Sequence, residues 1–113
     1  ITVYSGHTRT STYVYDCVNA LASIADNFKP GETYNIASKT NHTIEYLSDL
    51  ILQEPGANPG LVKRVDENEI LTTKDKFVDA SKAERDLKIT ESYSLEEGVK
   101  RTIEWMRRYY NLD

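Results

Sequence analysis

The chain has 113 residues, the size of one domain, and its 39% hydrophobic and 28% charged residues are ordinary for a soluble globular protein. Its 14 basic and 18 acidic residues give a net charge of −4, which argues against a nucleic-acid-binding protein, because such proteins carry a basic face. One or two well-placed arginines would still suffice to bind a small anion such as a phosphate. No apolar run approaches the roughly 18 residues of a membrane span, and no signal peptide is visible. The single cysteine, Cys17, rules out an internal disulfide and favours a reducing, cytoplasmic setting.

The first predicted helix covers residues 14–27. Its apolar residues recur at spacings of three and four, which predicts one core-facing stripe made of Val14, Val18, Leu21, Ala22 and Ala25. Lys29-Pro30-Gly31 ends this helix, because proline cannot continue it and glycine permits a turn. The next segment, TYNIA at 33–37, is a short β-type run between turn signals and is predicted to form a strand.

The middle of the chain predicts a helix, a loop and a strand. Thr43 is expected to cap a helix that runs to about Gln53. Residues 54–60, EPGANPG, are rich in helix breakers and predict a loop. LVKRV at 61–65 has the composition of a strand, and the charged run 66–76 predicts an exposed loop.

Two helices are predicted at the C-terminal end. Asp79 has the position of an N-cap for a short helix, ASKAERDL. Ser94 and Glu97 have capping-box spacing and begin a last helix that runs to about Tyr110. The inner stripe of that helix is predicted to contain Leu95, Val99, Thr102, Ile103, Met106 and Tyr110.

The order of these elements predicts an α/β fold with a small, mostly parallel sheet and helices. Only two or three short strands are available, whereas a typical sheet has about five or six. We therefore expect this sheet to extend a larger one.

The chain lacks the common catalytic motifs. It contains no glycine-rich dinucleotide loop, no GxxxxGK[ST] and no Gly-x-Ser-x-Gly, and no Cys/His cluster suggests a metal site. His7 and His42 fall in predicted loops and are expected to be solvated. No general acid–base pair stands out, so we expect no catalytic residue in this chain.

Four sequence blocks resemble extended short-chain dehydrogenases/reductases, the NAD-dependent nucleotide-sugar epimerases and dehydratases. Arg9-x-x-x-Tyr13-Val14-x-Asp16-x-Val18 is similar to that family's R-x-x-x-YV-x-D-x-V segment, and GETYNIA is similar to its GE-x-YNIG. DASKAERDLKI resembles D-x-SKA-x-x-x-LGW, and SLEEGVKRTIEWMRRYY resembles the closing LEEG-x-x-x-TI-x-W. The blocks occur in the family's order and together cover nearly the whole chain.

The resemblance implies that residues 1–113 are a C-terminal, substrate-binding domain. The Rossmann half, with its NAD-binding loop and its Tyr-x-x-x-Lys pair, is expected to lie outside this chain and to bind NAD or NADP. The parent enzyme would oxidise C4 of a nucleotide sugar in carbohydrate biosynthesis, as a lyase or an isomerase. It would form a homodimer through its Rossmann half, and this chain alone is expected to be inactive. The nucleotide base and the choice between dehydratase and epimerase stay open, with dTDP-glucose 4,6-dehydratase slightly favoured.

The resemblance also assigns three substrate-binding residues. Arg9 takes the position of the family's arginine that contacts the nucleotide diphosphate, and Asn35 that of the asparagine at the nucleotide site. Arg64 is the candidate for a second diphosphate-binding arginine, with Lys74 or Lys76 as alternatives, because the family's R-x-G-D pattern is missing. From the residues alone, Arg9 could equally be a solvated loop arginine, and Asn35 a polar residue that bonds nearby backbone.

Two other functions remain open at this level. The chain could be a free-standing nucleotide-sugar-binding module, or a non-catalytic partner of a separate Rossmann chain. Its eight tyrosines, two phenylalanines and one tryptophan are many for a small domain to bury alone. A part of a larger enzyme should therefore expose an apolar patch and be poorly soluble, marginally stable or dimeric in isolation.

Overall fold

The computed structural model describes residues 1–67, 70–89 and 92–112. The chain folds into two compact units, each made of two stretches that are distant in sequence. Unit 1 contains Ile1–Thr10 and Thr40–Phe77, and unit 2 contains Ser11–Lys39 and Val78–Asp113.

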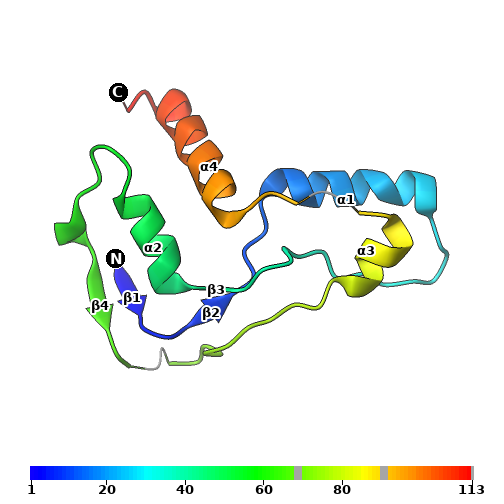
Figure 1. Ribbon diagram of the computed structural model, residues 1–113, viewed down its shortest axis with the longest axis horizontal. Helices are drawn as coiled ribbons and strands as arrows, with labels where there is room; N and C mark the ends of the chain where they lie inside the picture. Colours follow the sequence, from blue (N-terminus) through cyan, green and yellow to red (C-terminus); the bar gives the residue numbers. More distant parts are fainter. Residues whose placement is uncertain (68–69, 90–91, 113) are drawn as a thin grey trace. The chain divides into compact units, whose positions relative to one another are not determined.

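Unit 1 is a small α/β layer. Its elements are β1 (Thr2–Tyr4), β2 (Thr8–Arg9), β3 (His42–Thr43), α2 (Ile44–Leu52), a 3-10 turn (Pro59–Leu61) and β4 (Lys63–Val65). β1 pairs in parallel with β4, with Val3 opposite Arg64, and β2 pairs antiparallel with β3. Helix α2 packs against β1, as Figure 1 shows. Among the described residues of this layer, Val3 is the buried apolar one.

A glycine turn joins β1 to β2. Gly6 has a φ of +72°, which L side chains rarely adopt, and a Cβ there would lie 3.2 Å from Cε of Lys74. The Gly6 N–H donates to Oε1 of Glu45 on α2 at 2.7 Å. The turn is therefore fixed both by its own backbone and by the first turn of α2.

Unit 2 consists of three helices and their connections. They are α1 (Val14–Asn27), α3 (Ser81–Leu87) and α4 (Leu95–Tyr110). Helices α1 and α3 lie side by side (Figure 1). Small side chains allow this close approach, because Ala20 of α1 and Ala83 of α3 are buried. Ala80 and Leu87 are the other buried apolar residues among those described in this unit.

Polar side chains link these helices to their connections. Both carboxylate oxygens of the buried Asp16 accept the backbone N–H of Tyr93, at 3.2 and 3.1 Å. Asp16 therefore connects α1 to the segment before α4 rather than capping α1. On α3, Asp86 pairs with Lys29 Nζ at 3.3 Å and accepts the Tyr34 hydroxyl at 3.3 Å. Asp86 thus holds the chain that follows α1 against α3.

Three of the predicted helix starts are confirmed. Helix α1 has the predicted bounds, the Thr43 hydroxyl accepts the Tyr46 N–H at the start of α2, and the Ser94 hydroxyl accepts the Glu97 N–H at 3.2 Å at the start of α4. Asp79 accepts the Ser81 N–H at 2.9 Å, but the N-cap of α3 is Ala80, one residue after the predicted position. These contacts are local in sequence, which is why the residue pattern predicts them.

One prediction about a strand and one about a helix face are wrong, and a second strand is shorter than predicted. Residues 33–37 pair with no strand in the described part of the chain, and the strand predicted over 61–65 begins only at Lys63, after the 3-10 turn. The stripe of α1 predicted to face the core is exposed instead. The buried side of α1 carries Asp16 and Ala20, because that side meets α3 and the Tyr93 backbone.

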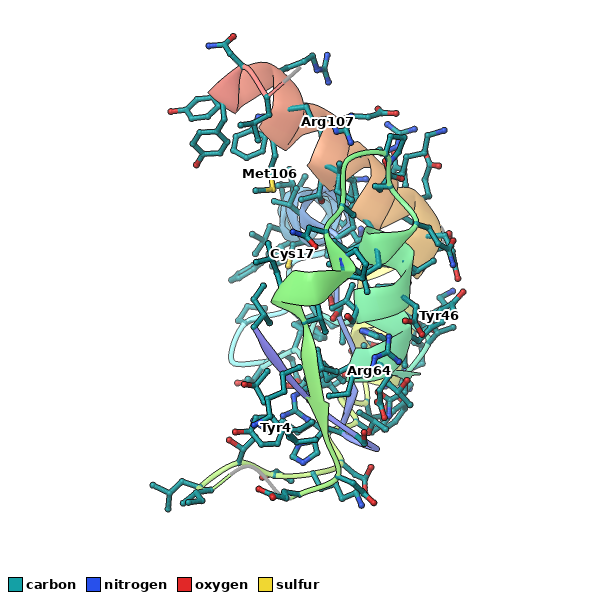
Figure 2. All side chains as sticks on the ribbon, turned by 90° about the vertical axis from the view of Figure 1, so that its left-hand side faces the viewer. Tyr4, Cys17, Tyr46, Arg64, Met106 and Arg107 are labelled. Carbon is teal, nitrogen blue, oxygen red and sulfur yellow. The ribbon has the colours of Figure 1, made fainter. Side chains whose placement is uncertain are left out.

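The last helix also departs from its prediction. Leu95, Val99 and Ile103 are half-buried, but Thr102, Met106 and Tyr110 of the predicted inner stripe are exposed. Trp105 is 52% exposed and stacks on Tyr109 with ring centroids 5.1 Å apart. Figure 2 shows Met106 on this exposed end of α4.

The predicted α/β fold class is confirmed. The parallel β1–β4 pair and the helices match the expectation, and the antiparallel β2–β3 pair adds strands of two residues each that no sequence pattern indicated. Among the described helices, none has the length and apolarity needed to cross a membrane.

Asp86 should make the stability of unit 2 depend on pH in the acidic range. Burial raises its pKa, but the hydrogen bond and charge of Lys29, the charge of Arg85 and the Tyr34 hydroxyl outweigh this, so the pKa lies below its ordinary value. A carboxyl with a lowered pKa stabilises the fold above its unfolded pKa, and this stabilisation is lost as the pH falls through the folded pKa.

We therefore expect Asp86→Asn to lower the free energy of unfolding at neutral pH. It should also flatten the fall in stability that begins below about pH 4 in the unchanged chain. Urea unfolding followed by circular dichroism from pH 7 to acid measures both effects. The exposed Asp26→Asn is the matched control, and identical pH profiles for the two variants would contradict this role of Asp86.

Candidate functional site

Strand β2 lies between two other segments of unit 1. On one side, Thr8 and Arg9 pair with Thr43 and His42 of β3. On the other, the Thr8 N–H donates to the Lys74 carbonyl at 2.9 Å, and the Lys76 N–H donates to the Thr8 carbonyl at 3.3 Å. Residues distant in sequence are thereby brought to one short strand.

Four basic side chains come from these three segments, and we call them the β2 cluster: Arg9, His42, Lys74 and Lys76. Arg9 is half-buried, and its Nη1 donates to the carbonyls of Thr8 at 2.6 Å and Lys74 at 3.1 Å. Within the described residues, no carboxylate forms an ion pair with Arg9. Asp75, the acidic residue between the two lysines, accepts the Thr8 hydroxyl at 3.1 Å.

This arrangement suits an anion. A guanidinium has five N–H donors in a planar arrangement that matches the oxygens of phosphate. In Arg9, the hydrogen bonds from Nη1 to two backbone carbonyls orient this group. Lys74 and Lys76 are exposed and add positive charge on the neighbouring segment. The β2 cluster is therefore the candidate binding site of this chain.

Arg64 has a different environment in the same unit. Its Nη2 pairs with Oδ1 of Asp49 on α2, and Figure 2 shows its side chain beside that helix. Its charge also acts on Glu45. Burial raises the pKa of Glu45, but the N–H groups of Glu45 and Gly6, the Ser5 hydroxyl and Arg64 together bring it below its ordinary value. The positive charge of Arg64 is thus met by carboxylates of α2.

Asn35 lies in unit 2, whereas Arg9 and Arg64 lie in unit 1. Its Nδ2 donates to the Asp79 carbonyl at 3.2 Å, and Asp79 directly precedes the buried Ala80, the N-cap of α3. This contact connects residues 33–37 to α3. It is the structural role that the residue type alone suggested for Asn35.

His7 is not solvated, contrary to the prediction. It is 1% exposed, its carbonyl accepts the Ile44 N–H, and its ring lies 5.7 Å from the Tyr4 ring between centroids. Neither ring nitrogen has a hydrogen-bond partner among the described residues. The prediction fails because the Gly6 turn directs the next residue inward, and this depends on contacts with α2 that sequence spacing does not encode.

The position of Lys74 beside β2 is the feature of the site that the residue pattern predicts least well. The resemblance offers Lys74 only as an alternative to Arg64, within a predicted loop, whereas the structure puts the Lys74 backbone beside β2. The only local signal is the alternation of Lys74, Asp75 and Lys76, which suits an extended segment along a strand.

The described residues do not fit a dinucleotide or a metal. None of the five glycines lies in a strand–loop–helix turn of the dinucleotide-binding type, and both sheets have two strands. In the part of the chain that the structure describes, no group of three His, Cys, Asp or Glu could hold a metal ion.

Comparison by sequence gives no match, either to a protein-family model or to a curated protein. Comparison by structure gives several matches. The dTDP-glucose 4,6-dehydratase of Bacillus anthracis str. Ames, in complex with NAD, matches with a TM-score of 0.79 at 20% identity, and the match covers 97% of this chain and 35% of the dehydratase chain. The UDP-glucuronic acid 4-epimerase of Bacillus cereus, in complex with NAD, has a TM-score of 0.78 at 23% identity over 99% of this chain and 34% of its own.

A third similar structure has higher identity. The Bordetella bronchiseptica enzyme WbmF, in complex with NADH, has a TM-score of 0.76 at 29% identity over 96% of this chain and 32% of its own. This chain therefore spans about a third of the length of the solved chains that it matches. Its fold is that of the C-terminal portion of extended short-chain dehydrogenases/reductases, as the four sequence blocks predicted.

The unpartnered ring of His7 predicts an unusual response to substitution. A neutral imidazole has one donor and one acceptor, and burying either without a partner costs about 1–3 kcal/mol. We expect His7→Leu to leave the free energy of unfolding unchanged or to raise it by about 1 kcal/mol.

Urea unfolding at pH 7 measures this change, with the half-buried His42→Leu as a comparison on the neighbouring strand. A loss of more than about 2 kcal/mol for His7→Leu would show that the buried ring is held by polar contacts.

Proposed function

We propose that this chain is the substrate-binding domain of an NAD-dependent nucleotide-sugar 4,6-dehydratase or epimerase, and that it anchors the nucleotide diphosphate. The observation that carries the proposal is Arg9, held on β2 among basic residues with no carboxylate paired to it in the described structure. The similar structures support it, because they include a dTDP-glucose 4,6-dehydratase and a UDP-glucuronic acid 4-epimerase.

Arg9 would bind the diphosphate through the edge of its guanidinium away from Nη1. Nη1 already donates to two carbonyls, and these bonds fix the plane of the fork before a ligand arrives. A bidentate contact of this kind is charge-assisted and directional. The arrangement would lower the entropy cost of ordering the side chain on binding.

The second cation of the site is Arg64 or Lys74. Arg64 is the assignment that the resemblance gives, and its pairing with Asp49 means that a phosphate would have to compete with a carboxylate. The backbone of Lys74 is hydrogen-bonded to β2, and its carbonyl accepts a second hydrogen bond, from Nη1 of Arg9. This geometry favours Lys74.

Asn35 is retained as a nucleotide contact in the proposal. Its amide donates to the Asp79 carbonyl, which orients the side chain, and its exposed position leaves room for a ligand.

The proposed domain contributes binding and positioning rather than hydride transfer. Because its described residues form no dinucleotide cradle, NAD or NADP would be held by a Rossmann half outside this chain, in a cytoplasmic enzyme that dimerises through that half. Binding energy from the nucleotide, far from the reacting carbon, would position the sugar for chemistry there. No catalytic residue is assigned to this chain.

Removal of Arg9 tests the proposal. We expect Arg9→Ala to weaken binding of UDP or dTDP to the chain by at least about tenfold, the effect of losing a charge-assisted hydrogen bond, and Arg9→Lys to restore only part of it. Isothermal titration calorimetry measures the affinity. Arg108→Ala on α4 removes the same charge outside unit 1 and should change little. Equal affinities for all variants would refute the anchoring role.

A matched pair of variants decides the second cation. We expect Lys74→Ala to weaken diphosphate binding several-fold and to reduce its salt dependence, because the variant removes one positive charge near the ligand. Arg64→Ala should change the affinity less, since its charge is already met by Asp49. The reverse order in the same titrations, repeated at two salt concentrations, would assign the contact to Arg64.

A further inference from the structure

The pairing around β2 sorts its neighbouring side chains by charge. Thr8 lies opposite Thr43 of β3 on one side and opposite Asp75 on the other, and Arg9 lies opposite His42. Paired residues of neighbouring strands place their side chains on the same face of a sheet, and successive residues alternate between the faces. Thr8, Thr43 and Asp75 therefore share one face. The 3.1 Å hydrogen bond from the Thr8 hydroxyl to Oδ1 of Asp75 agrees with this assignment.

The opposite face is basic. By the same alternation, it carries Arg9 and His42 from the two strands, and the neighbours of Asp75 along the chain, Lys74 and Lys76. All four members of the β2 cluster are thus on one face. Among residues 8–9, 42–43 and 74–76, the single carboxylate is on the other face, away from the guanidinium of Arg9.

His42 is the member of the β2 cluster whose charge changes near neutral pH. Arginine and lysine side chains stay protonated there, whereas imidazole gains its proton between about pH 5 and 8. Residues directly opposite in antiparallel strands have Cβ atoms about 4.5–5.5 Å apart, so the side chains of His42 and Arg9 can reach the same ligand. A protonated imidazole has two N–H donors, and its hydrogen bonds to phosphate are charge-assisted.

We infer that His42 is a further ligand of the anion that Arg9 binds, and that it binds as an imidazolium. The anion is then taken up together with a proton from the solvent. In the free chain, the positive charge of Arg9 opposes protonation of His42, and a bound anion favours it. The affinity for the anion therefore rises as the pH falls through the range in which imidazole titrates. The identity of the anion as a nucleotide diphosphate rests on the proposed function.

The charged groups on the elements beside β3 give the direction of this effect. The cations on the face of His42 are Arg9, Lys74 and Lys76. The carboxylates have other partners: Asp75 accepts the Thr8 hydroxyl, Glu45 of α2 accepts the N–H of the turn before β2, and Asp49 of α2 pairs with Arg64. Tyr46 of α2 is neutral in this pH range. A bound anion is therefore the negative charge that this face lacks.

Calorimetric titration of the chain with UDP-glucose at several pH values tests the inference. The diphosphate of this nucleotide sugar is esterified at both ends and does not titrate in this range, so a pH dependence comes from the chain. We expect the affinity to rise about fivefold from about pH 8 to about pH 5.5, the effect of one additional ion pair. Titration in two buffers of different ionisation enthalpy should show uptake of about 0.4 proton per ligand at the midpoint.

Three variants assign this dependence to a residue, because the chain has two histidines. His42→Gln should bind at every pH with the weaker affinity of the basic range and take up no proton. His42→Lys has a permanent charge and should bind at every pH with an affinity near that of the acidic range. His7→Leu removes the other histidine, which is buried, and should keep the full dependence. Circular dichroism at each pH checks the fold, and either His42 variant alone suffices.

Three results would overturn the inference. One is an affinity of the unchanged chain that is equal at both ends of the pH range. Another is a pH dependence that persists in full in His42→Gln. The third is a dependence that is lost in His7→Leu, which would assign it to the buried ring.

Titration with sulfate separates this inference from the proposed function, because sulfate is an anion that does not titrate in this range. Sulfate binding that strengthens in acid and requires His42, without binding of UDP-glucose, would support the inference and refute the nucleotide-sugar function. Binding of UDP-glucose that depends on Arg9 but is equal at all pH values would do the opposite. A chain that binds neither anion would refute both.

Discussion

The backbone pairing of Thr8 is the interaction on which the candidate site depends. Its N–H and carbonyl bond to residues 74–76, while its strand pairs with β3 on the other side. The Gly6 turn and its bond to Glu45 bring β2 to that position beside α2. Because of this pairing, the backbones of basic residues from three separate segments meet at β2, in a chain whose net charge is negative. In the proposal, the local charge of the β2 cluster, rather than the net charge of the chain, determines what this domain binds.

Helix starts that depend on local hydrogen bonds could be predicted from the sequence. The predictions that are wrong concern features that depend on contacts with residues distant in sequence. Thr43 and Ser94 cap helices through bonds to residues three positions later, so their sequence spacing suffices. The exposure of the apolar stripe of α1 cannot be predicted in this way, because periodicity identifies a stripe but not the element that packs against it. The prediction of a strand over residues 33–37 is wrong for a related reason. A strand needs a second strand to pair with, and the described residues supply none.

The site could be predicted only in part. Arg9 was assigned from a resemblance, and the structure adds the carbonyls that orient it. The Lys74 backbone lies close to β2, and His7 is buried beside the Gly6 turn. Both features depend on tertiary contacts that no residue pattern indicates. In the proposal, unit 1 anchors the diphosphate, which is consistent with a chain that spans about a third of the length of similar enzymes.

The most direct test of the central claim is a titration of the chain with UDP, followed by nuclear magnetic resonance of the arginine Nε–H groups. Our account predicts that the Arg9 resonance shifts with saturation, because its guanidinium binds phosphate, while the resonances of Arg85 on α3 and Arg108 on α4 do not move. An unchanged Arg9 resonance, or equal shifts of all the arginines, would contradict the account and leave the β2 cluster without a ligand.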